Sequence, residues 1–271
     1  MIELTNRLKS IALEIYSGES MADIGTDHGF LPIYLWQCGM CDKVIMTDVS
    51  RGSLSKAMAD AEAAAPGQMF DFRLGNGLEV IGAEEVDDIV IAGMGGELIR
   101  DILAKDIVKT KTFKKFILQP RSRSGVLRQW LDVNGFGIAE ESIVEEGPRV
   151  CEIITAVSLE YGGKDQKAAE RIRKSYGEVT SMPEEVSEGF SEPVRLGEEP
   201  PDSIKWEVPY WVQNSDDEIV EKFVRDKIGR ESEKLSGLSK GRIVNAAEFD
   251  RVKKGIKYLN ELLDPVYVNG R

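Results

Sequence analysis

The sequence contains one histidine and three cysteines in 271 residues, and both shortages limit the kinds of site it can hold. Cys38 and Cys41 have the spacing of a metal or redox pair, but no second pair follows. A single histidine leaves no ligand set for a closed zinc site, so we expect buried or half-buried thiols and no metal. The chain also lacks a run of eighteen apolar residues and a basic, apolar leader. We therefore expect no membrane span and a cytoplasmic location.

Positive charge is also scarce. The net charge of -12 argues against a protein that coats nucleic acid non-specifically, because phosphate affinity comes from Lys and Arg. The charge is uneven, however. Residues 178–202 hold eight acidic residues and one basic residue, whereas residues 219–271 hold twelve basic and eight acidic residues. An acidic protein with a locally basic end is compatible with RNA binding.

Residues 21–30 have the pattern of a buried strand, a tight glycine turn and the start of a helix. Such a turn lets backbone N–H groups face a nucleotide-like ligand. The spacing is Gly-x-x-x-Gly, without the third glycine of a dinucleotide fingerprint, and Asp27 stands inside the turn. A carboxylate there repels a pyrophosphate. It favours a cationic ligand, such as the sulfonium and amino acid end of S-adenosylmethionine.

Strand and helix patterns alternate along the first 160 residues. A helix is predicted over 3–17, further strands over 43–49, 69–74, 87–96 and 113–120, and a hairpin of strands over 137–144 and 149–159. Consecutive strands after five alternating units favour an α/β fold with a mainly parallel sheet and an antiparallel strand at one edge. A dinucleotide dehydrogenase would more often show a second βαβ half.

Polar residues and glycines follow several of the predicted strands. Asp48 lies about twenty residues past the glycine turn, where an acid reaches a ribose. The alternative is that it only caps the helix that starts near Ser50, but the glycine turn upstream favours ribose binding. Asn76 is either a turn residue or an amide that pairs with an adenine edge. The glycines at 93–96 either let backbone approach a ligand or allow close packing of strand and helix. Arg7 lies off the apolar stripe of the first helix, so it is either solvated or held over the site.

The composition changes after residue 162, which divides the chain into a ligand-binding domain (1–162) and a mainly helical C-terminal region (163–271). Within this region we predict a short charged helix over 164–176, an acidic linker over 178–202, and an aromatic cluster at 206–211 that packs onto the main domain. Two apolar stripes predict a helical hairpin over about 216–264, with a break from Gly237 to Gly241.

Four motifs together resemble those of the bacterial tRNA (adenine-N1)-methyltransferases that act on adenosine 22 of tRNA. They are Asp23-Ile24-Gly25-Thr26-Asp27-His28, Gly75-Asn76-Gly77-Leu78, Ile89-Val90-Ile91-Ala92-Gly93-Met94-Gly95-Gly96 and Leu118-Gln119-Pro120. The resemblance covers roughly residues 3 to 160. It implies a Rossmann-like class I methyltransferase domain that uses S-adenosylmethionine. It also implies a C-terminal helical appendage that binds the substrate, tRNA.

The resemblance also implies roles for individual residues. On the cofactor, Asp23, Gly25, Asp27 and His28 line the methionine side, Asp48 and Val49 hold the ribose, Asn76 and Gly77 meet the adenine, and Gly93, Met94 and Gly95 form the floor beside the methyl group. The candidate catalytic residues are Arg7, Asp27 and His28. The candidate substrate contacts are Gln119, Pro120, Arg121, Arg123 and Arg128.

The sequence leaves several of these roles open. Asp27 either accepts a hydrogen bond from the adenine N6 amine, which raises the nucleophilicity of N1, or organises the cofactor amine. His28 either orients the substrate or binds a backbone carbonyl at the turn. Each arginine is either a phosphate contact or a solvated charge.

No Asn/Asp-Pro-Pro-aromatic motif follows the fourth strand, which argues against the geometry of enzymes that methylate exocyclic amines. The alternatives are a methyltransferase for another RNA or a small molecule, a non-catalytic RNA-binding relative and, as the weakest, a dehydrogenase. The oligomeric state does not follow from the sequence.

Overall fold

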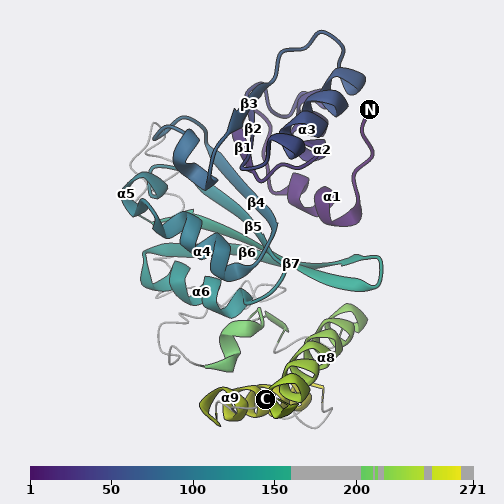
Figure 1. Ribbon diagram of the computed structural model, residues 1–271, viewed down its shortest axis with the longest axis vertical. Coiled ribbons are helices and arrows are strands. Elements are labelled where there is room, and N and C mark those ends of the chain that lie inside the picture. The colour runs from purple at the N-terminus through teal and green to yellow at the C-terminus, as the bar shows by residue number, and fades with distance from the viewer. Residues whose placement is uncertain (160–202, 210, 213–216, 241–245, 264–271) are drawn as a thin grey trace, which may run out of the picture.

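The computed structural model describes residues 1–159, 203–209, 211–212, 217–240 and 246–263. Its seven strands form one sheet in the order β3-β2-β1-β4-β5-β7-β6 (Figure 1). Their bounds are Met21–Ile24 (β1), Val44–Asp48 (β2), Asp71–Leu74 (β3), Asp88–Met94 (β4), Lys115–Pro120 (β5), Phe136–Glu146 (β6) and Arg149–Ser158 (β7). Strands β1 to β5 pair in parallel, and β7 is antiparallel to both β5 and β6. The predicted α/β fold is confirmed, with the antiparallel strand one place in from the edge because its hairpin partner β6 takes the edge.

The described helices are Asn6–Leu13 (α1), Phe30–Gln37 (α2), Arg51–Ala64 (α3), Gly96–Ala104 (α4), Ile107–Thr110 (α5), Ser124–Val133 (α6), Glu218–Lys240 (α8) and Ala246–Glu261 (α9), with 3-10 helices at Gly77–Val80 (η1) and Ile204–Glu207 (η4). Helix α1 is shorter than the predicted 3–17. It begins after Thr5, whose hydroxyl accepts a hydrogen bond from the N–H of Leu8. It ends where the N–H of Glu14 bonds to the carbonyl of Ile11, a tightened final turn.

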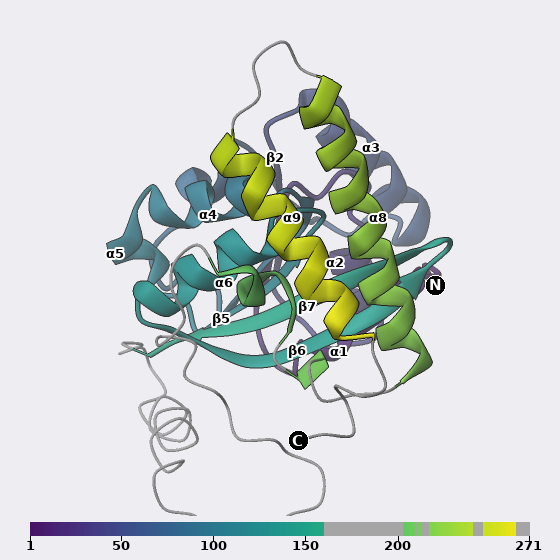
Figure 2. The ribbon, with the colours of Figure 1, turned by 90° about the horizontal axis from the view of Figure 1, so that it is seen from below.

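Helices α8 and α9 lie side by side (Figure 2). Helix α8 packs against the β6–β7 hairpin, and α9 packs against η4. Helix α8 continues through Gly237 to Lys240, so the predicted break at 237–241 begins too early. The predicted helix over 164–176 and acidic linker over 178–202 lie outside the described residues. In the aromatic cluster, Trp206 is buried and its carbonyl accepts a hydrogen bond from Arg128, so its predicted packing onto the main domain is confirmed.

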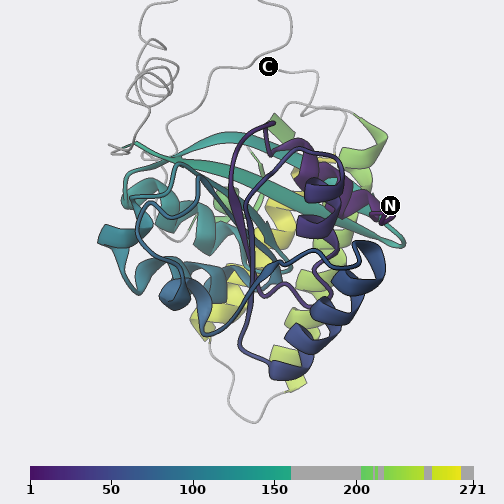
Figure 3. The ribbon, with the colours of Figure 1, turned by 90° about the horizontal axis from the view of Figure 1, so that it is seen from above.

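Helices cover both faces of the sheet (Figure 3) because successive strand residues point to opposite sides. Along β4, Ile89 and Ile91 join the core beneath α4 and α6, whereas Val90 joins the core beneath α1, α2 and α3. A third apolar cluster joins Val150 of β7 to Val224 of α8 and to residues around η4 and α9. The C-terminal helices therefore share a core with the sheet. Within the described part of the chain, no helix has the length and apolar character to cross a membrane.

Candidate active site

The parallel strands β1, β2, β4 and β5 end at one edge of the sheet, where ligands bind in open α/β folds. Two cavities open there. The first cavity has a volume of about 410 Å³ and the second about 660 Å³. Lining the first are Thr5, Arg7, Leu8, Asp23, Gly25, Thr26, Asp27, His28, Phe30, Leu31, Ala92, Gly93 and Arg121. The folded chain thus has cavities at the edge of the sheet that the sequence motifs identify.

The turn after β1 is held by its backbone. The N–H groups of Gly25 and Thr26 both donate to the carbonyl of Thr47, at 2.8 and 2.9 Å. Gly25 has a φ of 77°, and a Cβ added there would lie 2.2 Å from Cε of Met94. The left-handed conformation therefore favours glycine at this position, while the Met94 methyl, at the end of a flexible side chain, could move aside. Asp27 also has a positive φ, 48°, which Asp tolerates better than most residues.

Asp23 is a buried carboxyl at the end of β1. Its side chain accepts a hydrogen bond from the hydroxyl of Thr26 at 2.7 Å. Burial raises the pKa of Asp23 to about 6, the Thr26 bond and Arg7 oppose this rise, and Asp48 adds to it. A carboxyl of this kind gains from a cationic ligand, because an opposite charge nearby stabilises its ionised form.

Asp27 and His28 make contacts with helix α3 that sequence reasoning missed. Lys56 lies 3.2 Å from the Asp27 carboxylate, and Nδ1 of His28 lies 2.7 Å from the carboxylate of Asp60. The His28 ring also stacks on Phe30, with ring centroids 5.1 Å apart. Because Lys56 and Asp60 are four residues apart, the sequence places them on one face of α3, but it does not show which element that face meets.

Asp48 is the nearly buried last residue of β2. Its carboxylate accepts from the N–H of Ser50 at 2.8 Å, and Ser50 itself caps α3 by accepting from the N–H of Ser53. Capping of α3 therefore belongs chiefly to Ser50. Val49, beside it, is exposed. The N–H of Gly75 bonds to the carbonyl of Asp48 and brings the ends of β2 and β3 together. Asn76 therefore lies at the same edge of the sheet, where it is exposed. Gly77 is buried.

The glycines at the end of β4 and the start of α4 serve two different purposes. A Cβ on Gly96 would lie 2.3 Å from the carbonyl oxygen of Arg123, so this glycine permits close packing. Gly93 has a φ of 78°, and a Cβ there would meet nothing within 4 Å. Its backbone lines both cavities. Packing thus accounts for Gly96, whereas Gly93 leaves the junction of the two cavities open. Met94 and Gly95 follow it, and Met94 covers Gly25.

Helix α1 carries Arg7 to the junction of the two cavities. Nη1 of Arg7 donates to Oε1 of Gln119 at 3.3 Å, and the backbone N–H of Arg7 donates to Glu146 at 3.1 Å. Oε1 of Gln119 also accepts from the N–H of Gly93 at 3.1 Å. Gln119 is nearly buried, and Pro120 after it lines the second cavity. The side-chain amide of Gln119 therefore positions Arg7 beside Gly93.

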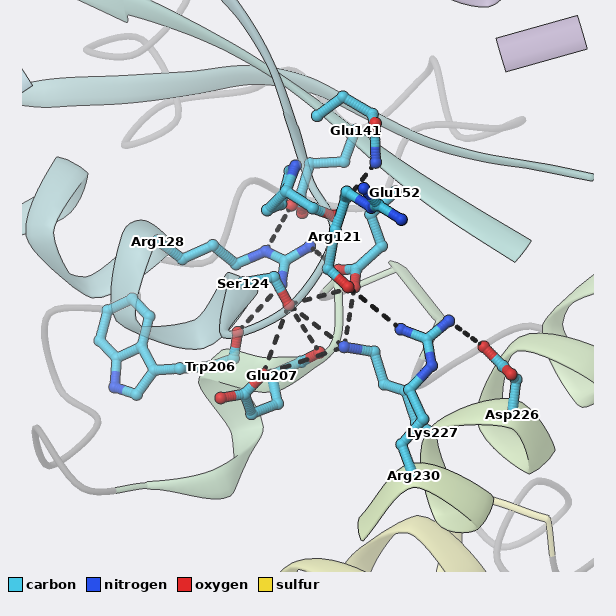
Figure 4. A network of polar contacts seen from close by, with 12 residues as sticks. Arg121, Ser124, Arg128, Glu141, Glu152, Trp206, Glu207, Asp226, Lys227 and Arg230 are labelled. Atoms are coloured by element: carbon cyan, nitrogen blue, oxygen red, sulfur yellow. Dashed lines mark hydrogen bonds and ion pairs between the residues drawn. The ribbon is translucent and has the colours of Figure 1, made fainter. Parts of the chain in front are cut away.

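The three arginines that follow β5 differ in their surroundings, and Figure 4 shows two of them, Arg121 and Arg128. Arg121 lines both cavities. Arg123 is partly exposed and pairs with Glu97 at 3.0 Å. Arg128 has no exposed surface and is paired with Glu141 at 2.6 Å and with Glu152 at 2.7 Å. The prediction that Arg128 contacts substrate is wrong, because its guanidinium is sealed between the sheet and the C-terminal region.

Among the described residues, no three His, Cys, Asp or Glu side chains gather in a way that would hold a metal ion. The sheet order and the two glycine turns are those of a Rossmann-like methyltransferase. The family model described as a methyltransferase domain matches residues 4–154.

Comparison with curated proteins and solved structures narrows this class. The tRNA (adenine(22)-N(1))-methyltransferase of Bacillus subtilis (strain 168) is 35% identical over 164 residues, which are 60% of this chain and 68% of that protein. The crystal structure of the B. subtilis m1A22 tRNA methyltransferase TrmK has a TM-score of 0.71 at 25% identity, over 97% of this chain and 100% of that chain. TrmK of M. capricolum, solved with S-adenosyl-homocysteine, shares the fold at 20% identity with a TM-score of 0.66, over 96% of this chain and 98% of that chain. The chain belongs to the family of the bacterial tRNA (adenine(22)-N(1))-methyltransferases.

Proposed function

We propose that this chain transfers a methyl group from S-adenosylmethionine to N1 of adenosine 22 in tRNA. The observation that carries the proposal is that two cavities meet at the end of β4, where Arg7, Gly93 and Arg121 line both of them. One cavity has the glycine turn and carboxyls that suit the cofactor. The other supplies space for the nucleoside that receives the methyl group. The family membership supports the same reaction, and tRNA as substrate makes the cytoplasm the expected compartment.

The residues of the first cavity fit S-adenosylmethionine. The buried carboxyl of Asp23 and the exposed carboxylate of Asp27 suit the cationic amino acid end. Asp48 is not part of the cavity lining, but it ends β2 and accepts a hydrogen bond from the N–H of Asp27, a position that suits a ribose. Asp27 lines the first cavity and is absent from the lining of the second. This position favours a role for Asp27 toward the cofactor amine rather than toward the adenine N6 amine.

The reaction needs positioning more than it needs a base. The cofactor supplies an electrophilic methyl group, and N1 of adenine has a free lone pair, so no proton has to be removed before attack. Holding the reacting atoms in line then lowers most of the barrier. In this chain Gln119 fixes Arg7 beside Gly93, so that both bound partners meet a preorganised wall.

The decisive experiment incubates the chain with labelled S-adenosylmethionine and unmodified tRNA and maps the modified nucleotide by its reverse-transcription stop. We expect a stop at adenosine 22 that disappears in the Asp27→Ala variant. Asp42→Ala is the matched control, because Asp42 is an exposed aspartate before β2, at the opposite edge of the sheet. A label at another nucleotide, or in no RNA, would exclude the proposed substrate.

A small-molecule methyltransferase is the competing function. Such an enzyme would be indifferent to RNA. It would also be expected to stay active when residues 205–271 are deleted, which suggests a deletion test. The structure argues against that deletion, because it would expose Val150 of β7 and leave the buried Glu152 without its partner Lys227. The full chain assayed with and without tRNA separates the two functions more cleanly.

A further inference from the structure

The second cavity extends from the catalytic edge to the C-terminal helices. It is enclosed by the ends of β4 and β5, by the β6–β7 hairpin and by α8, and its volume of about 660 Å³ is typical of a ligand pocket. Arg7, Gly93 and Arg121 line both this cavity and the first. A group bound in the second cavity therefore has direct access to the methyl-transfer position.

Four arginines from four different elements line the second cavity: Arg7 of α1, Arg121 after β5, Arg149 of β7 and Arg230 of α8. Their charges converge. Burial raises the pKa of the Cys151 thiol on the cavity wall, while Arg7, Arg230 and Arg149 each act to lower it. Glu146, on the same wall, acts in the opposite direction.

Most acidic groups of the lining are already neutralised. Glu146 lies 3.9 Å from the guanidinium of Arg7, Asp226 pairs with Arg230, and Glu152 is held by Lys227 at 2.8 Å. Within the described residues, the side chains of Arg121 and Arg149 have no ion-pair partner, and Glu233 is the one unpaired acid of the lining. The uncompensated charge of this cavity is therefore positive, although the whole chain is acidic.

Arg230 also bridges the gap between α8 and the catalytic edge. Its Nη1 donates to the backbone carbonyl of Arg121 at 3.4 Å, which is a long hydrogen bond (Figure 4). Its side chain remains 43% exposed, so its remaining donors are accessible from the cavity. Arg149, at the start of β7, is also exposed and lines the same cavity.

N1 lies on the Watson–Crick edge of adenine, so an adenosine must leave its paired or stacked position before N1 reaches an enzyme-bound methyl group. An extruded nucleotide brings a phosphate on each side, and arginine binds phosphate through a planar fork of donors. We propose that the second cavity seats the extruded target nucleotide of the RNA and that Arg149 and Arg230 bind its flanking phosphates. This inference rests on the proposed function and adds the place and the residues of substrate binding.

The test compares Arg149→Gln and Arg230→Gln with Arg225→Gln in the full-length chain. Arg225 is an exposed arginine of the same helix, paired with Glu221, and lies about 140° around the axis from Arg230. We expect KM for tRNA to rise roughly tenfold to a hundredfold in the first two variants and to stay near the wild-type value in the third. The affinity for S-adenosylmethionine, measured by calorimetry, should be unchanged in all three.

The salt dependence of tRNA binding provides a second measurement that a structural defect would not mimic. Loss of one phosphate contact lowers the slope of log Kd against log salt concentration by roughly 0.7 to 0.9. We expect this change for Arg149→Gln and Arg230→Gln and not for Arg225→Gln.

Three outcomes would overturn the inference: equal effects in all three variants, an unchanged KM in the first two, or a loss of cofactor affinity in the first two. If the wild-type chain methylates no tRNA, the proposed function fails instead. Arg149 is exposed on a hairpin strand, so its variant remains informative even if Arg230→Gln disturbs α8.

Discussion

Replacement of Arg128 by methionine should destabilise the fold strongly, whereas the same replacement of Arg123 should not. Both arginines belong to the segment that forms α6, and both pair with glutamates. They differ in burial, since the side chain of Arg128 is 0% exposed and that of Arg123 is 35% exposed. Comparing the two variants therefore measures how burial changes the contribution of an ion pair to the free energy of unfolding.

The magnitude follows from the groups that Arg128 leaves behind. Its guanidinium donates to Glu141, to Glu152 and to the carbonyl of Trp206, at 2.6, 2.7 and 3.0 Å. Glu152 keeps Lys227, but Glu141 loses the partner that its burial requires. Removal of one side of a buried ion pair costs about 3–5 kcal/mol, whereas a partly exposed pair such as Arg123 and Glu97 contributes about 0–1 kcal/mol.

Urea unfolding, followed by the fluorescence of the four tryptophans, gives both free energies of unfolding. The two variants should also differ in tRNA methylation. Arg123→Met should raise KM for tRNA, because Arg123 is accessible to phosphate. Arg128→Met should lower activity only through the loss of folded protein. Equal free energies of unfolding for the two variants would refute the reasoning, as would a stable Arg128→Met chain with a specific defect in tRNA binding.

Three further predictions follow from single residues. The folded-state pKa of Asp23 is raised to about 6, so the native chain keeps a proton that the unfolded chain releases near pH 4. The contribution of Asp23 to the free energy of unfolding should therefore fall by about 3 kcal/mol as pH rises from 4 to 6. Asp23→Asn should abolish this fall in urea titrations. Burial alone raises the pKa of Glu19, but hydrogen bonds from Lys114, Lys115 and the backbone N–H of Tyr16 help to lower it to about 2. Glu19→Gln should therefore destabilise the fold at pH 7 and differ less from wild type as pH falls from 4.5 toward 2. Gly93→Ala should lower kcat at least about tenfold, because the added Cβ enters the junction of the cavities. Gly147→Ala is the control, since Gly147 also has a positive φ, 59°, and open space around it. It should show only the backbone strain of about 1–2 kcal/mol in a stability assay.

The catalytic edge was largely predictable because its determinants are local. A strand that ends in a glycine turn signals its own geometry, and the parallel order of strands brings Gly25, Asp48 and Gly93 to the same edge without further information. The family motifs named the same positions. What the motifs did not show is which helix covers the turn, and so Lys56 and Asp60 were missed.

Arg128 was mispredicted because its partners are distant in sequence. Glu141 and Glu152 lie on two strands of the hairpin, and only their pairing brings both carboxylates beneath α6. One local sign was present: Arg128 follows Ser124 by four residues and precedes Leu131 by three, which places it on the buried face of α6. A charge on an apolar face requires buried partners of opposite sign, and a single sequence does not reveal them.

The β6–β7 hairpin joins the C-terminal helices to the catalytic edge. Successive strand residues point to opposite sides, and at the end of β6 Glu145 bonds to Lys222 of α8 at 2.7 Å, whereas Glu146 bonds to the backbone of Arg7 in α1. The hairpin lies between these two helices (Figure 1). Two adjacent carboxylates of β6 therefore link α8 to α1, the helix that carries Arg7 to Gly93. If the proposed function holds, this arrangement gives the helical appendage a route by which it could set the position of a base beside Gly93.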